Sequence, residues 1–113
     1  MLSIATITKH SKRAKHKQHK HVAVLVKGGA IVAVGYNHRN THAEIKAIKQ
    51  VWPDHREGLV LWSFRITNSG KLAMALPCPA CTKEMVKNGI TKVHYSDSDG
   101  QMKFMKLPKE RKL

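Results

Sequence analysis

Blocks of cationic and apolar residues divide the first third of the chain. Residues 2–20 start with a few apolar side chains and then become strongly basic, which favours a first helix with a cationic end. Two nearly continuous apolar runs follow, at 22–27 and 30–36, joined by Gly28-Gly29. Glycine accommodates the positive φ angles of a tight turn, so this stretch predicts a β-hairpin. Because both runs are almost wholly apolar, we expect both faces of the two strands to be covered.

The segment 42–52 has the spacing of an amphipathic helix. Ile45, Ile48 and Trp52 share one stripe, and lysines occupy another. Pro53 marks the end of the pattern. We therefore expect the apolar stripe to face the core.

The second half of the chain alternates between strand and helix patterns. The expected elements are strands at 59–66, 91–96 and 101–107, an extended segment at 71–76, and a helix from Cys78-Pro79 to Asn88-Gly89. The turn at 97–100 is too short to contain a crossover helix. The last two strands should therefore pair antiparallel.

This order of elements predicts an α/β fold, with helices packed on the faces of one mixed five-stranded sheet. The chain of 113 residues is expected to form a single domain, 1–113. Within it, 1–21 would be a basic N-terminal helix or arm and 108–113 a charged C-terminal tail.

Positive charge dominates the composition. Lys and Arg number 21 against 7 Asp and Glu, for a formal net charge of +14, and the first acidic residue is Glu44. Such a field attracts phosphate-bearing partners, either a nucleotide or a nucleic acid. The basic stretch also holds His10, His16, His19 and His21. Since no carboxylate or cysteine accompanies them, we expect a solvated basic face and not a metal site.

No apolar run reaches the length needed to span a membrane, and no signal peptide is recognisable. We therefore expect a cytoplasmic protein without a membrane partner. In that compartment, two cysteines three positions apart favour metal binding or redox chemistry over a structural disulfide.

His42, Cys78 and Cys81 provide one imidazole and two thiolates at the starts of predicted helices. Three protein ligands leave the fourth tetrahedral position of Zn²⁺ for water, which is the catalytic arrangement. Zinc lowers the pKa of such a water from 15.7 to about 7. Glu44, two residues after His42, can take a proton from that water and return it to a substrate nitrogen and the leaving amine.

The pattern His42-Ala43-Glu44 with Pro77-Cys78-Pro79-Ala80-Cys81 resembles the cytidine deaminase-like superfamily of zinc-dependent deaminases. The resemblance extends from the predicted hairpin to the last strand. It implies a three-layer α-β-α fold, zinc held by the histidine and both cysteines, and Glu44 as the proton shuttle. It also implies that the backbone N–H of Ala43 binds the carbonyl oxygen of the base, that Asn37 contacts the substrate, and that the protein forms a homo-oligomer.

The resemblance favours deamination of cytosine to uracil in a nucleoside, a nucleotide or a single-stranded nucleic acid. A last strand antiparallel to its neighbour resembles the cytidine deaminase branch. Histidine as the first ligand is instead similar to the adenosine and deoxycytidylate branches, and Leu76 replaces a residue that is often polar. An adenine- or guanine-type deaminase and a deoxycytidylate deaminase are therefore kept as alternatives.

Two other interpretations use the same residues differently. Thr41-x-x-Glu44 on its own is a capping box of a helix N-terminus. The cysteines could instead hold a structural zinc with His94 or His55 as fourth ligand, in a non-catalytic nucleic-acid-binding module. For the aromatic residues we expect core packing in most cases, with base stacking as the alternative. They include Trp52, Trp62, Phe64 and Tyr95.

Overall fold

The computed structural model describes residues 20–37, 42–67 and 69–109. The helix expected over 2–20 and the end of the charged tail lie outside these residues. The elements are β1 (Lys20–Lys27), β2 (Ala30–Tyr36), α2 (Ala43–Lys49), a 3₁₀ turn (Pro53–His55), β3 (Val60–Ile66), β4 (Leu72–Ala73), α3 (Pro79–Lys87), β5 (Lys92–Ser96) and β6 (Met102–Lys106). None of the described helices is long and apolar enough to cross a membrane.

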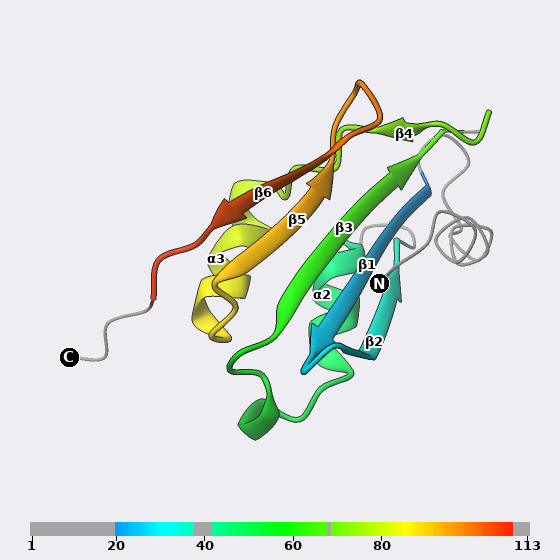
Figure 1. Ribbon diagram of the computed structural model, residues 1–113. Coiled ribbons are helices and arrows are strands. Elements are labelled where there is room, and N and C mark those ends of the chain that lie inside the picture. The colour runs from blue at the N-terminus through cyan, green and yellow to red at the C-terminus, as the bar shows by residue number, and fades with distance from the viewer. Residues whose placement is uncertain (1–19, 38–41, 68, 110–113) are drawn as a thin grey trace.

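The described strands form one mixed sheet in the order β2-β1-β3-β5-β6, with the two-residue β4 paired to the end of β3 (Figure 1). β3 and β5 are parallel, and every other pair is antiparallel. The chain passes through α3 between the two parallel strands, as such a connection requires. The mixed sheet and the antiparallel β5–β6 pair confirm the predictions. The segment 71–76, expected only to be extended, contributes β4 as a short sixth strand to the sheet expected to have five.

The β1–β2 hairpin forms around the predicted glycine turn. Gly28 and Gly29 have φ angles of 60° and 81°, which only glycine adopts readily. β1 is the buried strand of the hairpin, whereas β2 lies at the edge of the sheet. Ile31 and Val32 are consequently 46% and 47% exposed, so the expectation that both strands are covered on both faces is wrong for β2.

Both described helices pack on the same face of the sheet, behind it in the view of Figure 1. Their buried side chains, such as Ile48 and Met85, meet Leu25, Leu61 and Val93 from the strands. A second cluster on the opposite face contains Val22, Val24, Phe64 and Ile66. Among the described residues no helix covers that opposite face, and the first helix expected over 2–20 lies outside them.

Helix α2 lies unusually close to strand β2. A Cβ atom added at Gly35 would collide with the backbone oxygen of Ala43 and would lie 2.6 Å from the backbone nitrogen of Ala47. Glycine therefore permits the approach of the helix to the sheet. Because Ala43 begins α2, this contact also sets the position of the residues around the start of the helix.

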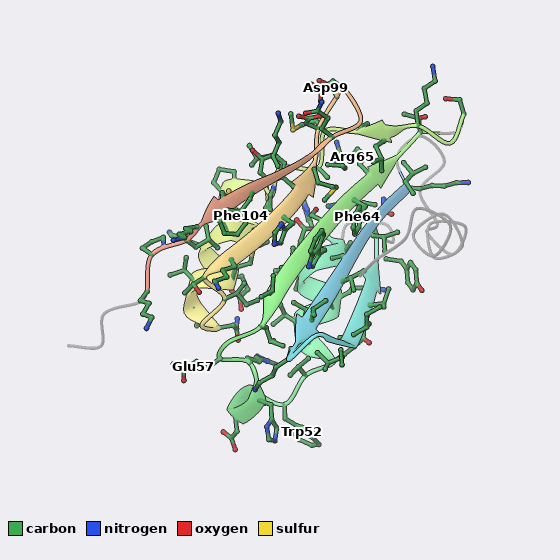
Figure 2. All side chains as sticks on the ribbon, in the orientation of Figure 1. Trp52, Glu57, Phe64, Arg65, Asp99 and Phe104 are labelled. Atoms are coloured by element: carbon green, nitrogen blue, oxygen red, sulfur yellow. The ribbon has the colours of Figure 1, made fainter. Side chains whose placement is uncertain are left out.

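Two side chains lie where the sequence pattern did not predict them. Helix α2 ends at Lys49, earlier than expected, so Trp52 leaves the helical stripe and is 78% exposed. Figure 2 shows Trp52 pointing away from the sheet beside the 3₁₀ turn. Strand β1 begins at Lys20, so His21 belongs to the sheet and is only 6% exposed. The expected solvated basic face is therefore wrong for His21.

Candidate active site

The two described helices bring three potential zinc ligands together. His42 is the N-cap of α2, and Cys78 is the N-cap of α3, with Pro79 at the first helical position. Cys81 lies in the first turn of α3. The ligand atoms of His42, Cys78 and Cys81 all lie within 4.8 Å of one another, although more than thirty residues separate the histidine from the cysteines.

The chemistry of this group fits zinc. The side chain of Cys81 is buried, that of Cys78 is half-buried and that of His42 is exposed, so the group opens toward solvent at the histidine. Burial, the charge of Glu44 and hydrogen bonding with Cys78 together raise the pKa of the Cys81 thiol above its usual range. A thiolate at this position therefore needs a nearby cation, and a nitrogen–sulfur–sulfur donor set is one that Zn²⁺ prefers.

A fourth protein ligand is not found among the described residues. His94 stacks on Trp62, with ring centroids 3.9 Å apart, and tilts against Phe104 on the face of the sheet opposite the helices. Neither His94 nor His55 belongs to the group of ligand atoms. Within the described part of the chain, the group thus offers three protein ligands and leaves one tetrahedral position open.

Glu44 lies in the first turn of α2 and is 1% exposed. Its carboxylate is close enough to Cys81 for hydrogen bonding between them to contribute to the raised pKa of that thiol. His42 is the N-cap of the helix, and Thr41, the proposed cap of the capping box, lies outside the described residues. Glutamates that only cap a helix are ordinarily exposed, whereas the Glu44 carboxylate is almost fully buried beside the ligand group. This burial argues against a capping role alone.

A polar network behind Glu44 was not predicted from the sequence. His21 Nδ1 lies 3.4 Å from Glu44 Oε1, and His21 Nε2 lies 2.7 Å from the Ser63 hydroxyl oxygen. The Ser63 hydroxyl in turn lies 2.9 Å from the carbonyl oxygen of Ala75, to which it can donate. The available signal was the strand period, because His21 is in phase with Ala23 and Leu25, which face the helices.

The two residues expected to contact substrate occupy defined positions. Asn37 directly follows β2, and its Oδ1 accepts a hydrogen bond of 3.0 Å from the backbone N–H of His21. Its own backbone N–H donates to the carbonyl oxygen of His21 at 3.2 Å. Ala43 is the first residue of α2, where a backbone N–H has no acceptor within the helix. The roles of Asn37 and Ala43 toward a substrate stay predictions.

Comparison with known structures supports the fold. A dCMP deaminase from the cyanophage S-TIM5, in its apo form, is 25% identical, with a TM-score of 0.63 over 84% of this chain and 79% of that one. The same enzyme in complex with dCMP and dUMP gives 23% identity and a TM-score of 0.62, over 84% of this chain and 78% of that one. RibD from Acinetobacter baumannii is 18% identical, with a TM-score of 0.59 over 83% of this chain, which spans only 27% of the RibD chain.

Sequence comparison defines the family. No curated protein sequence matches this chain. The profile of the family described as "Cytidine and deoxycytidylate deaminase zinc-binding region" matches residues 2–97, which is most of the length of this chain. The His-Cys-Cys group and this match identify Zn²⁺ as the cofactor of the site. The chain therefore belongs to the cytidine and deoxycytidylate deaminase family.

Proposed function

We propose that the protein is a hydrolytic deaminase that converts the cytosine of a nucleotide to uracil. The observation that carries this proposal is the meeting of His42, Cys78 and Cys81, whose ligand atoms lie within 4.8 Å of one another, with Glu44 buried beside them. Three ligands with an open position, together with an acid that is not itself a ligand, are the components of hydrolysis at a zinc site.

In this proposal each residue has a separate task. His42, Cys78 and Cys81 hold Zn²⁺, which when bound makes a water acidic enough to attack at neutral pH. Glu44 takes one proton from the attacking water and gives it to the ring nitrogen of the substrate, and then moves a second proton, from the hydroxyl group now on the ring carbon, to the leaving amine. Water is consumed and ammonia is released. The Ala43 N–H binds the carbonyl oxygen of the base, and Asn37 helps to hold the substrate.

Two observations favour a nucleotide as the substrate. The cyanophage dCMP deaminase is 25% identical to this chain, over 84% of the length of this chain. The net charge of +14 favours a ligand that carries phosphate over an uncharged nucleoside. The deoxycytidylate alternative therefore becomes the first substrate to test. The same charge supports single-stranded nucleic acid as the second candidate substrate.

The test is to incubate the zinc-loaded protein separately with dCMP, cytidine, deoxycytidine, adenosine, and single- and double-stranded oligonucleotides. Products are read by mass spectrometry, and the Glu44→Ala variant is the control for contaminating activity. We expect dCMP to be converted to dUMP with release of ammonia. Turnover of cytosine in oligonucleotides alone would replace the nucleotide proposal with the nucleic-acid one. Absence of turnover with all substrates would refute both.

A further inference from the structure

His21 is a buried polar residue to which the proposed reaction assigns no task. It lies in β1 with its side chain on the face of the sheet that carries the helices, and it is 6% exposed. Its ring connects two buried groups, Ser63 on β3 and Glu44 on α2. A histidine in such a place costs free energy of desolvation unless both ring nitrogens find partners.

Counting hydrogen atoms indicates which nitrogen of the ring carries one. Ser63 has a single hydroxyl hydrogen and two neighbours, His21 Nε2 at 2.7 Å and the Ala75 carbonyl oxygen at 2.9 Å. Glu44 Oε1 is buried and has no hydrogen bond in the structure, and His21 Nδ1 lies 3.4 Å from it. A bare nitrogen facing an ionised carboxylate oxygen would be repulsive, so an ionised Glu44 requires a hydrogen on Nδ1.

This conclusion holds for both charge states of the ring. In the neutral ring, Nδ1–H faces Glu44 and Nε2 accepts the Ser63 hydroxyl hydrogen. In the imidazolium, both nitrogens donate and Ser63 donates to Ala75. Burial lowers the pKa of His21, opposed by the charge of Glu44, while Arg65 and His42 lower it further. Both forms therefore place a hydrogen on Nδ1, and the imidazolium also keeps the hydrogen bond that Ser63 donates to Ala75.

We propose that His21 is a positioning residue that holds Glu44 Oε1 through Nδ1–H and so directs the other carboxylate oxygen toward the zinc site. Ser63 fixes the ring from behind at Nε2. Without this donor, a glutamate side chain has several rotamers that would take its carboxylate away from the ligand group. The inference rests on the proposed function for the task of Glu44, but the contact itself can be tested without any activity.

A matched pair of substitutions separates positioning from packing. Asn at position 21 places its amide nitrogen near the site of Nδ1, whereas Gln places its amide nitrogen near the site of Nε2. His21→Asn therefore keeps a donor for Glu44 and loses the contact with Ser63, and His21→Gln does the reverse. We expect His21→Gln and His21→Ala to lower kcat by about 10- to 100-fold, the effect of losing a residue that orients an active-site group. His21→Asn should retain kcat within about threefold of the unsubstituted protein.

The substitutions should leave KM and the zinc content unchanged, because His21 is not proposed to touch substrate or metal. Equal kcat for His21→Asn and His21→Gln would overturn the proposal, since a packing role does not distinguish the two amides. Full activity of His21→Ala would overturn it as well.

The second test uses no substrate and no substitution of His21. Long-range ¹H–¹⁵N spectra of the zinc-loaded protein report which nitrogen of each histidine ring carries hydrogen. We expect a protonated Nδ1 for His21, and the loss of this hydrogen-bonded signal in Glu44→Ala. A bare Nδ1 in the unsubstituted protein would refute the contact. If the protein turned over no substrate but showed the protonated Nδ1, the proposed function would fail while the contact stood.

Discussion

Replacing Gly35 with alanine should push helix α2 away from the sheet and weaken zinc binding. The added Cβ would collide with the backbone oxygen of Ala43 and lie 2.6 Å from the backbone nitrogen of Ala47. Both obstacles are backbone atoms of α2, so no side chain can rotate to relieve the collision. The helix must move, and it carries Glu44 and follows directly on His42.

The size of the effect follows from two opposing terms. Inserting a methyl group into a packed interior typically costs about 1 to 3 kcal/mol. The φ of Gly35 lies outside the left-handed region, so alanine can adopt the backbone conformation found there. Alanine also lowers the conformational entropy of the unfolded chain, which stabilises the folded state by about 0.4 to 1 kcal/mol. We expect a net loss of roughly 1 to 2 kcal/mol in the free energy of unfolding. Displacing His42 from the cysteines should lower zinc affinity by at least about tenfold.

Gly28→Ala is the matched control for this substitution. Gly28 lies in the same hairpin, and a Cβ there meets nothing within 4 Å, although its φ of 60° is unfavourable for alanine. Stability is measured by urea unfolding with chelator present, and zinc affinity by competition with a chromophoric chelator. Both variants should lose stability, but only Gly35→Ala should lose zinc affinity. Normal zinc affinity in Gly35→Ala would show that the close helix–sheet contact does not position the site.

Three further outcomes are expected. Glu44→Ala should keep its zinc and lose about 10²- to 10⁴-fold in kcat, because it removes only the proton carrier; full activity with bound zinc would exclude that role. Cys78→Ala should lose the metal, and an equal zinc content by elemental analysis would contradict the ligand assignment. Burial and the charge of Lys92 lower the pKa of His94 below its ordinary 6.5, so the unfolded chain binds more protons below that pH. The free energy of unfolding should therefore fall as pH drops below about 6.5, and less steeply in His94→Phe, which keeps an aromatic ring against Trp62; parallel pH profiles would refute this.

The features predicted correctly from the sequence depend on short-range constraints. Gly28-Gly29 permits a tight turn between two apolar runs, and the four-residue turn at 97–100 forces its flanking strands to be antiparallel. The position of Cys78 at the start of α3 follows from a proline at the first helical position. Each of these depends on residues within a few positions of one another.

The sequence indicated the residues of the candidate site but not that they lie close together. The spacing of His42 and Glu44 and that of Cys78 and Cys81 pointed to zinc chemistry before any fold was known. That the two segments meet within 4.8 Å follows from the packing of α2 and α3 on the same face of the sheet. Local pattern does not specify that distance, because it depends on strand order and on the space left by Gly35.

His21 illustrates the difference between what the sequence determines and what only the tertiary structure determines. By itself the sequence determined the turns, most element positions and the candidate zinc ligands, since these depend on residue type and local spacing. His21 ends a run of basic residues, and the only local feature that distinguishes it from the other histidines there is its phase with Ala23 and Leu25. Only the tertiary structure decided that it is buried, because its partners Ser63 and Glu44 are distant in sequence and meet it only when β1, β3 and α2 pack together.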